Sequence, residues 1–212
     1  MTETTKVKST DQANSCLKKS SNVRSCIDFK SMWKSHPLNW EPPENAPFRK
    51  ETPKPKKKKG NTPFDVLLEE EDPPGDPIYE NQCAIKMSIA LQGAGVSLDT
   101  YPKNRSEVRY VRQLQKKIRG ALAAEELAIW LSRAIGNPEP AYKNGEALKK
   151  IKGRTGVVFF KDYWQRTPNG ALDGDHIDLW DGKTTPGQSS TYYEGYVTAF
   201  DKAAEVWFWE IK

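Results

Sequence analysis

Cys83 is the residue of this sequence best suited to nucleophilic chemistry. It follows Asn81 and Gln82 at the start of the segment NQCAIKMSIALQGAG, where Asn81 is an acceptable helix N-cap. In the first turn of such a helix, unpaired N–H groups and the helix dipole lower a thiol pKa and could hold an oxyanion. Most free cysteines are instead small buried hydrophobes, and residue type alone fits that interpretation equally well.

A base for this thiol must come from one of two histidines, His36 and His176. His176 lies in the segment GDHIDLWDG, whose alternation places it with Asp178 and Trp180 on one side of a strand. Taken alone, His176 fits a surface histidine above a turn; together with Cys83 it indicates a cysteine–histidine hydrolase. His36 lies among prolines in a segment expected to be weakly ordered, and we expect it to be a poor base.

A third group would hold the His176 tautomer and stabilise the imidazolium. Asp178 is the first choice, two residues along the same strand. Gln188, beyond the following turn, is the second choice, and Asp181 the third.

The elements that must position these residues are helices first and antiparallel strands after them, which is an α+β layout. We expect a short helix at FKSMW stopped by Pro37, the helix that carries Cys83, and a strong helix at RGALAAEELAIWLSRAIG. RSEVRYVRQLQKKI is interpreted as a loop and the start of a helix. Strands are expected at TGVVFFKDYW, at DHIDLW before an Asp-Gly turn, at STYYEGYVTAF and at EVWFWEIK, with a short helical piece at FDKAAE.

Charge and proline divide the chain unevenly. Residues 1–60 hold 14 Lys and Arg against 6 Asp and Glu, whereas the remainder holds 19 against 22. Residues 1–27 are expected to be a poorly ordered basic tail, and residues 39–78 a Pro-, Lys- and acid-rich insertion or linker. The lysine run at 54–59 allows a nucleic-acid interpretation, but it lacks interleaved aromatic residues and acids follow it, so a solvated linker is favoured.

Other function classes have little support. The sequence has no apolar run of membrane-spanning length, and its N-terminus lacks the apolar core of a signal peptide. Its three cysteines, at 16, 26 and 83, have no CxxC spacing that would suggest zinc. Cys16 and Cys26 could pair or could both be ordinary thiols. We therefore expect no metal, no cofactor, and neither membrane nor nucleic acid as partner.

Five segments in order resemble the type VI secretion amidase effectors of the fourth group: FKSMWKSHP, NQCAIKMSIALQGAGVSL, GRTGVVFFKDYW, GDHIDLWDG and AAEVWFWEI. The resemblance covers residues 28–38 and 79–212. It implies a papain-like fold of the NlpC/P60 class, with a catalytic helix packed on an antiparallel sheet, and an amidase domain over 28–212. It places the family's nucleophile on Cys83 and its base on His176. Some members have an aspartate in a cysteine-bracketed loop where this chain has Gly187 and Gln188, so Asp178 is inferred from the residues and not from the family.

The resemblance also implies a biological role. Such effectors are made in the bacterial cytoplasm without a signal peptide, are secreted, and reach the periplasm of a target cell. They cleave the D-glutamyl–meso-diaminopimelate bond of peptidoglycan stem peptides. Their partners are a cognate immunity protein and a component of the secretion apparatus. Three alternatives stay open: a papain-like protease or deamidase acting on a protein of the target cell, a basic nucleic-acid-binding protein, and a non-catalytic interaction domain.

Overall fold

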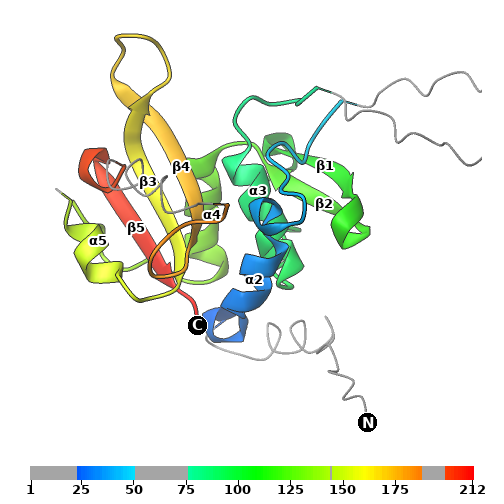
Figure 1. Cartoon of the computed structure of the whole chain (residues 1–212), viewed down its shortest axis with the longest axis horizontal. Helices are drawn as coiled ribbons and strands as arrows, with labels where there is room; N and C mark the ends of the chain where they lie inside the picture. Colours follow the sequence, from blue (N-terminus) through cyan, green and yellow to red (C-terminus); the bar gives the residue numbers. More distant parts are fainter. Residues whose placement is uncertain (1–22, 51–75, 144, 188–198) are drawn as a thin grey trace, which may run out of the picture.

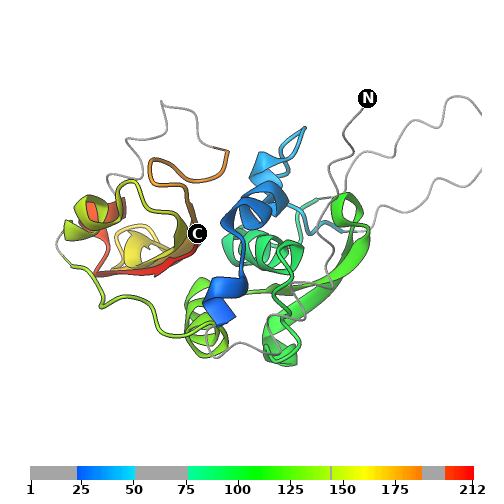
Figure 2. The same ribbon diagram turned by 90° about the horizontal axis from the view of Figure 1, so that it is seen from below.

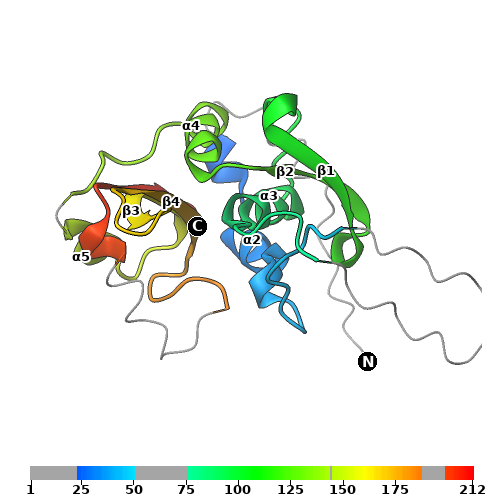
Figure 3. The ribbon, with the colours of Figure 1, turned by 90° about the horizontal axis from the view of Figure 1, so that it is seen from above.

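The structure is a computed structural model that describes residues 23–50, 76–143, 145–187 and 199–212. A three-stranded antiparallel sheet lies on one side and a β-hairpin on the other, with two helices, α2 and α3, between them (Figure 1). Views from below and above show the same order and place α4 beside α3, next to the sheet (Figures 2 and 3). The α+β, papain-like arrangement predicted from the sequence is confirmed.

Helices α2 (Phe29–Ser35) and α3 (Cys83–Gly93) pack against each other. Together they position the site residues that come from the first half of the chain. Asp28 caps α2 by accepting from the Ser31 N–H at 2.8 Å, and the helix ends before Pro37, which cannot continue it. Helix α3 is buried on nearly all sides and ends at Gly93, before Gly95 with φ of 89°. Both helices were predicted from the sequence.

The main sheet has the order β4-β3-β5, built from β3 (Gly156–Gln165), β4 (Leu172–Trp180) and β5 (Glu205–Glu210). Its two faces are both buried, which explains the continuous apolar sequence of β3. Val157, Phe159, Ile177 and Leu179 face the cluster formed by α3 and α4 (Ala124–Ala134). Val158, Phe160, Trp180 and Phe208 face a second cluster with α5 (Glu146–Ile151) and the short helical stretch 199–202.

One predicted element is wrong. The segment expected to be a loop and helix start is a hairpin of β1 (Ser106–Val111) and β2 (Lys116–Ala121), joined by the short 3-10 helix η5 (Arg112–Leu114). Gln115 closes the turn in the left-handed conformation, with φ of 50°. Tyr110 is 61% exposed and Val108 is 46% exposed, so one face of β1 lies in solvent although it holds apolar residues. The sequence of β1 therefore shows no clear alternation of polar and apolar residues. The hairpin supports α3 through β2.

Residues 23–27 and the described edges of the proline-rich insertion pack against the core. Val23–Cys26 form a 3-10 helix, η1, and Arg24 donates to the carbonyls of Ile135, Gly136 and Asn137 beyond α4. Ile27 is buried. Within the insertion, Phe48 is completely buried, and Arg49 forms a β-bridge with Pro77.

Several sequence predictions fall outside the described residues. These are the tail up to residue 22, the lysine run at 54–59, Cys16, Gln188 and most of the strand expected at 190–200. The last two residues of that predicted strand, 199 and 200, are helical, and they open a helical stretch at 199–202 that overlaps the helical piece predicted at 200–205. Cys26 is disulfide-bonded. No helix in the described part of the chain is long and apolar enough to cross a bilayer.

Candidate active site

Cys83 is the first residue of α3 and is partly exposed. The N-cap is Gln82 and not Asn81 as predicted, and the Gln82 side chain does not cap the helix. Its amide instead pairs with the Phe48 backbone, accepting from the N–H and donating to the carbonyl at 2.9 Å each. The N-terminus of α3 therefore keeps its first N–H groups clear of any side-chain cap, as an oxyanion site requires.

His176 on β4 is hydrogen-bonded to Cys83, so the structure brings together the two residues paired from the sequence. Burial opposes ionisation of the thiol, but the hydrogen bond and charge of His176, with backbone N–H groups of Ile177 and Ala84, lower the Cys83 pKa overall. Burial likewise opposes protonation of His176, yet Asp178 and Cys83 outweigh it and raise the His176 pKa to about 10. Both shifts favour the thiolate–imidazolium pair over the neutral thiol and imidazole.

Asp178 contacts the imidazole on its other side, with Oδ2 3.3 Å from His176 Nε2. This leaves Nδ1 as the nitrogen available to Cys83. The Asp178 side chain is 6% exposed, and its Oδ1 accepts from the Leu179 N–H at 2.8 Å. Burial opposes ionisation of this carboxyl, but His36, His176 and the Leu179 N–H hold its pKa below the usual value.

Of the two alternatives to Asp178, the structure describes only Asp181. Asp181 caps the turn after β4, where its Oδ1 accepts from the N–H groups of Lys183 and Thr184 at 2.8 and 2.7 Å. Gly182 at this turn has φ of 96°, as the predicted Asp-Gly turn requires. Gln188 is outside the described residues.

Sequence reasoning missed two residues at the site, His36 and Tyr163. His36 was expected in a weakly ordered segment, but it is 1% exposed and its Nε2 lies 3.3 Å from Asp178 Oδ1. Tyr163 follows a bulge in β3 at which Asp162 has φ of 50°, and its ring lies edge-on to His176 with centroids 6.3 Å apart. No local pattern marks either residue, because each reaches the site through tertiary packing.

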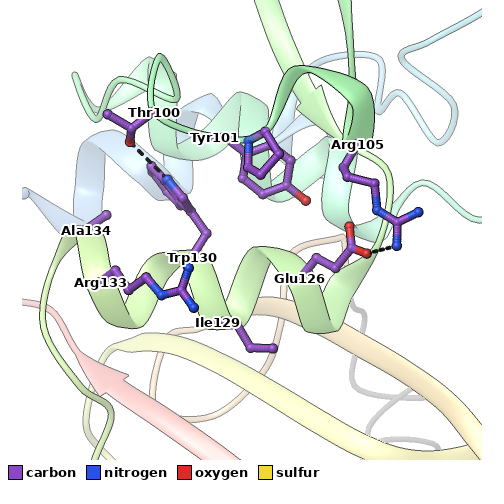
Figure 4. A pocket seen from close by; sticks show the side chains of 9 residues that line it. Thr100, Tyr101, Arg105, Glu126, Ile129, Trp130, Arg133 and Ala134 are labelled. Carbon is purple, nitrogen blue, oxygen red and sulfur yellow. Dashed lines mark hydrogen bonds and ion pairs between the residues drawn. The ribbon is translucent and has the colours of Figure 1, made fainter.

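A separate pocket of about 440 Å³ lies between α4 and the segment before β1 (Figure 4). Trp130, Ile129 and Tyr101 line it together with Arg133 and the Arg105–Glu126 ion pair. None of Cys83, His176 and Asp178 contributes to it. Among the described residues, no cluster of His, Cys, Asp and Glu is suited to hold a metal ion.

A cysteine at the N-terminus of a helix, paired with a histidine on an adjoining antiparallel sheet, defines the papain-like class of cysteine hydrolases. Residues 79–209 match the family model described as Type VI secretion system (T6SS), amidase effector protein 4, or Tae4. This match covers more than half of the chain, and the chain belongs to the Tae4 family. It is an amidase effector of type VI secretion, and its hydrolase chemistry is that of a cysteine enzyme.

A solved structure of the family agrees with this assignment at the level of the fold. Tae4 from Enterobacter cloacae superposes with a TM-score of 0.54 at 14% identity, over 88% of this chain and 97% of that one. Tae4 from Salmonella typhimurium, solved with the immunity protein Tai4 from Enterobacter cloacae, is 17% identical over 63% of this chain and 77% of that one, with a TM-score of 0.45. No curated protein matches the chain.

Proposed function

We propose that this effector hydrolyses the amide bond between D-glutamate and meso-diaminopimelate in peptidoglycan stem peptides, in the periplasm of a target cell. Cys83 is the nucleophile, His176 the acid and base, and Asp178 the group that orients His176. The observation that carries this proposal is the continuous hydrogen-bonded series from the Cys83 thiol through His176 to the buried Asp178 carboxylate. The family's amidase activity supports the reaction class.

In the first half of the reaction, the Cys83 thiolate attacks the carbonyl carbon of the glutamyl group. The negative charge that develops on the carbonyl oxygen is stabilised by N–H groups at the N-terminus of α3, including that of Cys83. The C–N bond then breaks, and the His176 imidazolium gives its proton to the departing amine of diaminopimelate. A thioester between Cys83 and the glutamyl group remains.

In the second half, water attacks the thioester and His176, now neutral, takes its proton. The C–S bond breaks, the glutamate carboxylate leaves, and the thiolate–imidazolium pair is restored. Asp178 stabilises the imidazolium in both halves because its Oδ2 faces Nε2. No oxidant, metal or cofactor is needed for this balance.

Digestion of purified peptidoglycan, followed by mass analysis of the soluble muropeptides, tests the proposal. We expect fragments that end in a free D-glutamate carboxylate and fragments with a free diaminopimelate amine, their combined mass exceeding that of the parent by one water. Cys83→Ala should reduce the rate about 10⁴-fold or more. Normal cleavage by this variant contradicts the nucleophile assignment, and cleavage at another amide contradicts the bond assignment.

We infer that an immunity protein protects the producing cell by covering the Cys83 cleft. The solved complexes of Tae4 relatives with Tai4 support this inference. Delivery requires a component of the secretion apparatus that binds the folded chain. Co-purification of the effector with the product of an adjacent gene, and loss of muropeptide release at equimolar ratio, would support the first partner.

A further inference from the structure

His36 is the other histidine of the chain, and the reaction proposed above does not use it. It comes between α2 and the short 3-10 helix η2 (Pro37–Asn39), where it ends one and begins the other. Its backbone N–H donates to the Trp33 carbonyl at 3.2 Å, so the end of α2 fixes its position. The side chain is almost completely buried and faces Asp178, which lies on β4.

The hydrogen bonds of His36 define its tautomer. The Leu38 N–H donates to Nδ1 at 3.4 Å, so Nδ1 is an acceptor and carries no proton. In the neutral imidazole the proton is then on Nε2, 3.3 Å from Asp178 Oδ1. Burial lowers the His36 pKa to about 4 against the opposing charge of Asp178, with Lys86 and His176 lowering it further, so the ring is neutral at pH 7.

Asp178 is thus held from two sides by two different histidines. His176 Nε2 is hydrogen-bonded to Oδ2, and His36 Nε2 lies 3.3 Å from Oδ1, which accepts from the Leu179 N–H. A buried carboxylate needs several donors to stay ionised, and its orientation follows from where those donors lie. A neutral donor suits this position, because a second full positive charge beside His176 would favour the neutral thiol–imidazole pair.

The segment around His36 is anchored to the loop after β4 by a second contact. Asn39 donates from Nδ2 to the Trp33 carbonyl at 2.8 Å and accepts at Oδ1 from the Gly187 N–H at 3.2 Å. Gly187 has φ of 70°, and a Cβ there would lie 2.9 Å from Leu38 Cβ. The approach of this segment to the loop after β4 is therefore specified by residues on both sides.

We propose that His36 is a positioning residue of this amidase, whose Nε2–H fixes the Asp178 carboxylate and through it the catalytic imidazole of His176. The proposal rests on the function proposed above, since it needs Asp178 to orient His176. His36 touches neither Cys83 nor the reacting amide. The charged and titratable groups around the His36–Asp178–His176 series are Lys86 from α3, Cys83 from α3 and Tyr163 from β3.

Two substitutions separate the Asp178 contact from the local turn. His36→Asn keeps an acceptor near the place of Nδ1 for the Leu38 N–H but loses the donor to Asp178. His36→Gln carries an amide N–H near the place of Nε2 and keeps that donor. We expect His36→Asn to lower kcat for muropeptide hydrolysis about tenfold, with KM little changed and the alkaline limb of the kcat profile moved to lower pH. His36→Gln should restore most of both.

Met32→Ala is the control for loss of packing, since Met32 is fully buried on α2. It should lower the melting temperature without moving the pH profile. Equal losses in His36→Asn and His36→Gln that follow their melting temperatures, or no change in kcat and profile in either variant, overturn the proposal. If Asp178→Asn retains full activity, the proposed role of Asp178 fails first. If Cys83→Ala retains activity, the proposed function fails independently of His36.

A measurement on the unmodified chain keeps the proposal testable even if His36→Asn does not fold. The chain has two histidines, so ¹⁵N labelling of histidine gives two sets of ring nitrogen signals, and His36→Gln assigns them. At pH 7 we expect His36 to be neutral with its proton on Nε2, and His176 to be an imidazolium. A His36 signal from the Nδ1–H tautomer, or from a cation, overturns the proposal.

Discussion

At the residue scale, two opposing influences act on the Cys83 thiol. Burial raises its pKa, whereas the hydrogen bond and charge of His176 lower it, and the lowering prevails. His176→Ala should therefore raise the thiol pKa above its ordinary value, because burial remains and its compensation is lost. We expect iodoacetamide at pH 7 to alkylate this variant at least about tenfold more slowly than the unmodified chain, as measured by intact mass.

Two comparisons complete this alkylation experiment. Cys83→Ala gives the background, and it should take up no label while the Cys26 disulfide is intact. The Tyr163 ring faces His176. Tyr163→Phe removes only the hydroxyl of this ring and leaves the imidazole in place. Its alkylation rate should stay within a few-fold of the unmodified chain. A His176→Ala variant that reacts as fast as the unmodified chain would show that His176 does not activate the thiol.

His36 also predicts how stability depends on pH. Its pKa is lowered by burial from 6.5 to about 4 in the folded chain, so the unfolded chain binds the proton more readily. The free energy of unfolding should fall as pH decreases from 6.5 toward 4, by about 2 kcal/mol at pH 5. Urea unfolding at pH 7 and pH 5 measures this, and His36→Gln should remove most of that loss.

Neither His176 nor Asp178 obscures the change in stability expected between pH 6.5 and pH 4. The pKa of His176 is raised to about 10 despite its burial, so its contribution to stability is complete below pH 6.5 and is lost only as pH rises toward 10. The pKa of Asp178 is lowered, so its contribution is lost as pH falls below about 4. An equal loss of stability at pH 5 in the unmodified chain and in His36→Gln would contradict the burial of a neutral His36.

At the scale of elements, Gly93 sets the distance between α2 and α3. A Cβ at this position would lie 2.2 Å from Ser35 Cβ, which the end of α2 holds in place beside His36. Gly93→Ala should push α2 away, reduce the free energy of unfolding by about 1–3 kcal/mol and lower kcat together with it. Chemical unfolding and muropeptide release measure the two effects.

Ser35→Gly supplies the matched test for this contact. In the double variant it removes the atoms that the new methyl group meets, so most of the lost kcat should return. The glycine costs about 1 kcal/mol at this helix end, so stability should return less completely than activity. A double variant as slow as Gly93→Ala alone would show that another contact transmits the effect.

The elements that carry the site could be predicted from the sequence because each has its own local signal. Helix α3 begins at Cys83 and is stopped by Gly93 and Gly95, and β4 alternates His176 and Asp178 with buried aliphatic residues. The hairpin β1–β2 was not predicted, because Val108 and Tyr110 are apolar residues on its exposed face. They hide the alternation of polar and apolar residues by which a half-buried strand is recognised.

At the scale of the whole molecule, the site is assembled from segments far apart in the chain, and this assembly had no local signal. The end of α2 contributes His36, the start of α3 contributes Cys83, and β4 contributes His176 and Asp178. The prolines around His36 predicted a weakly ordered segment, yet tertiary packing buries that histidine against Asp178 of β4. Contacts of this kind depend on the fold and not on which residues are neighbours in the sequence.

The cellular effect of the chain should depend on where it meets its substrate. Peptidoglycan lies outside the inner membrane, so expression with a periplasmic leader should lyse a bacterium whose wall contains meso-diaminopimelate, whereas cytoplasmic expression should not. Cys83→Ala with the same leader should be harmless, and His36→Asn should delay lysis because it lowers kcat without removing the nucleophile. Culture density and viable counts measure these outcomes. Killing by cytoplasmic chain that persists in Cys83→Ala would point to a toxic activity outside the proposed site.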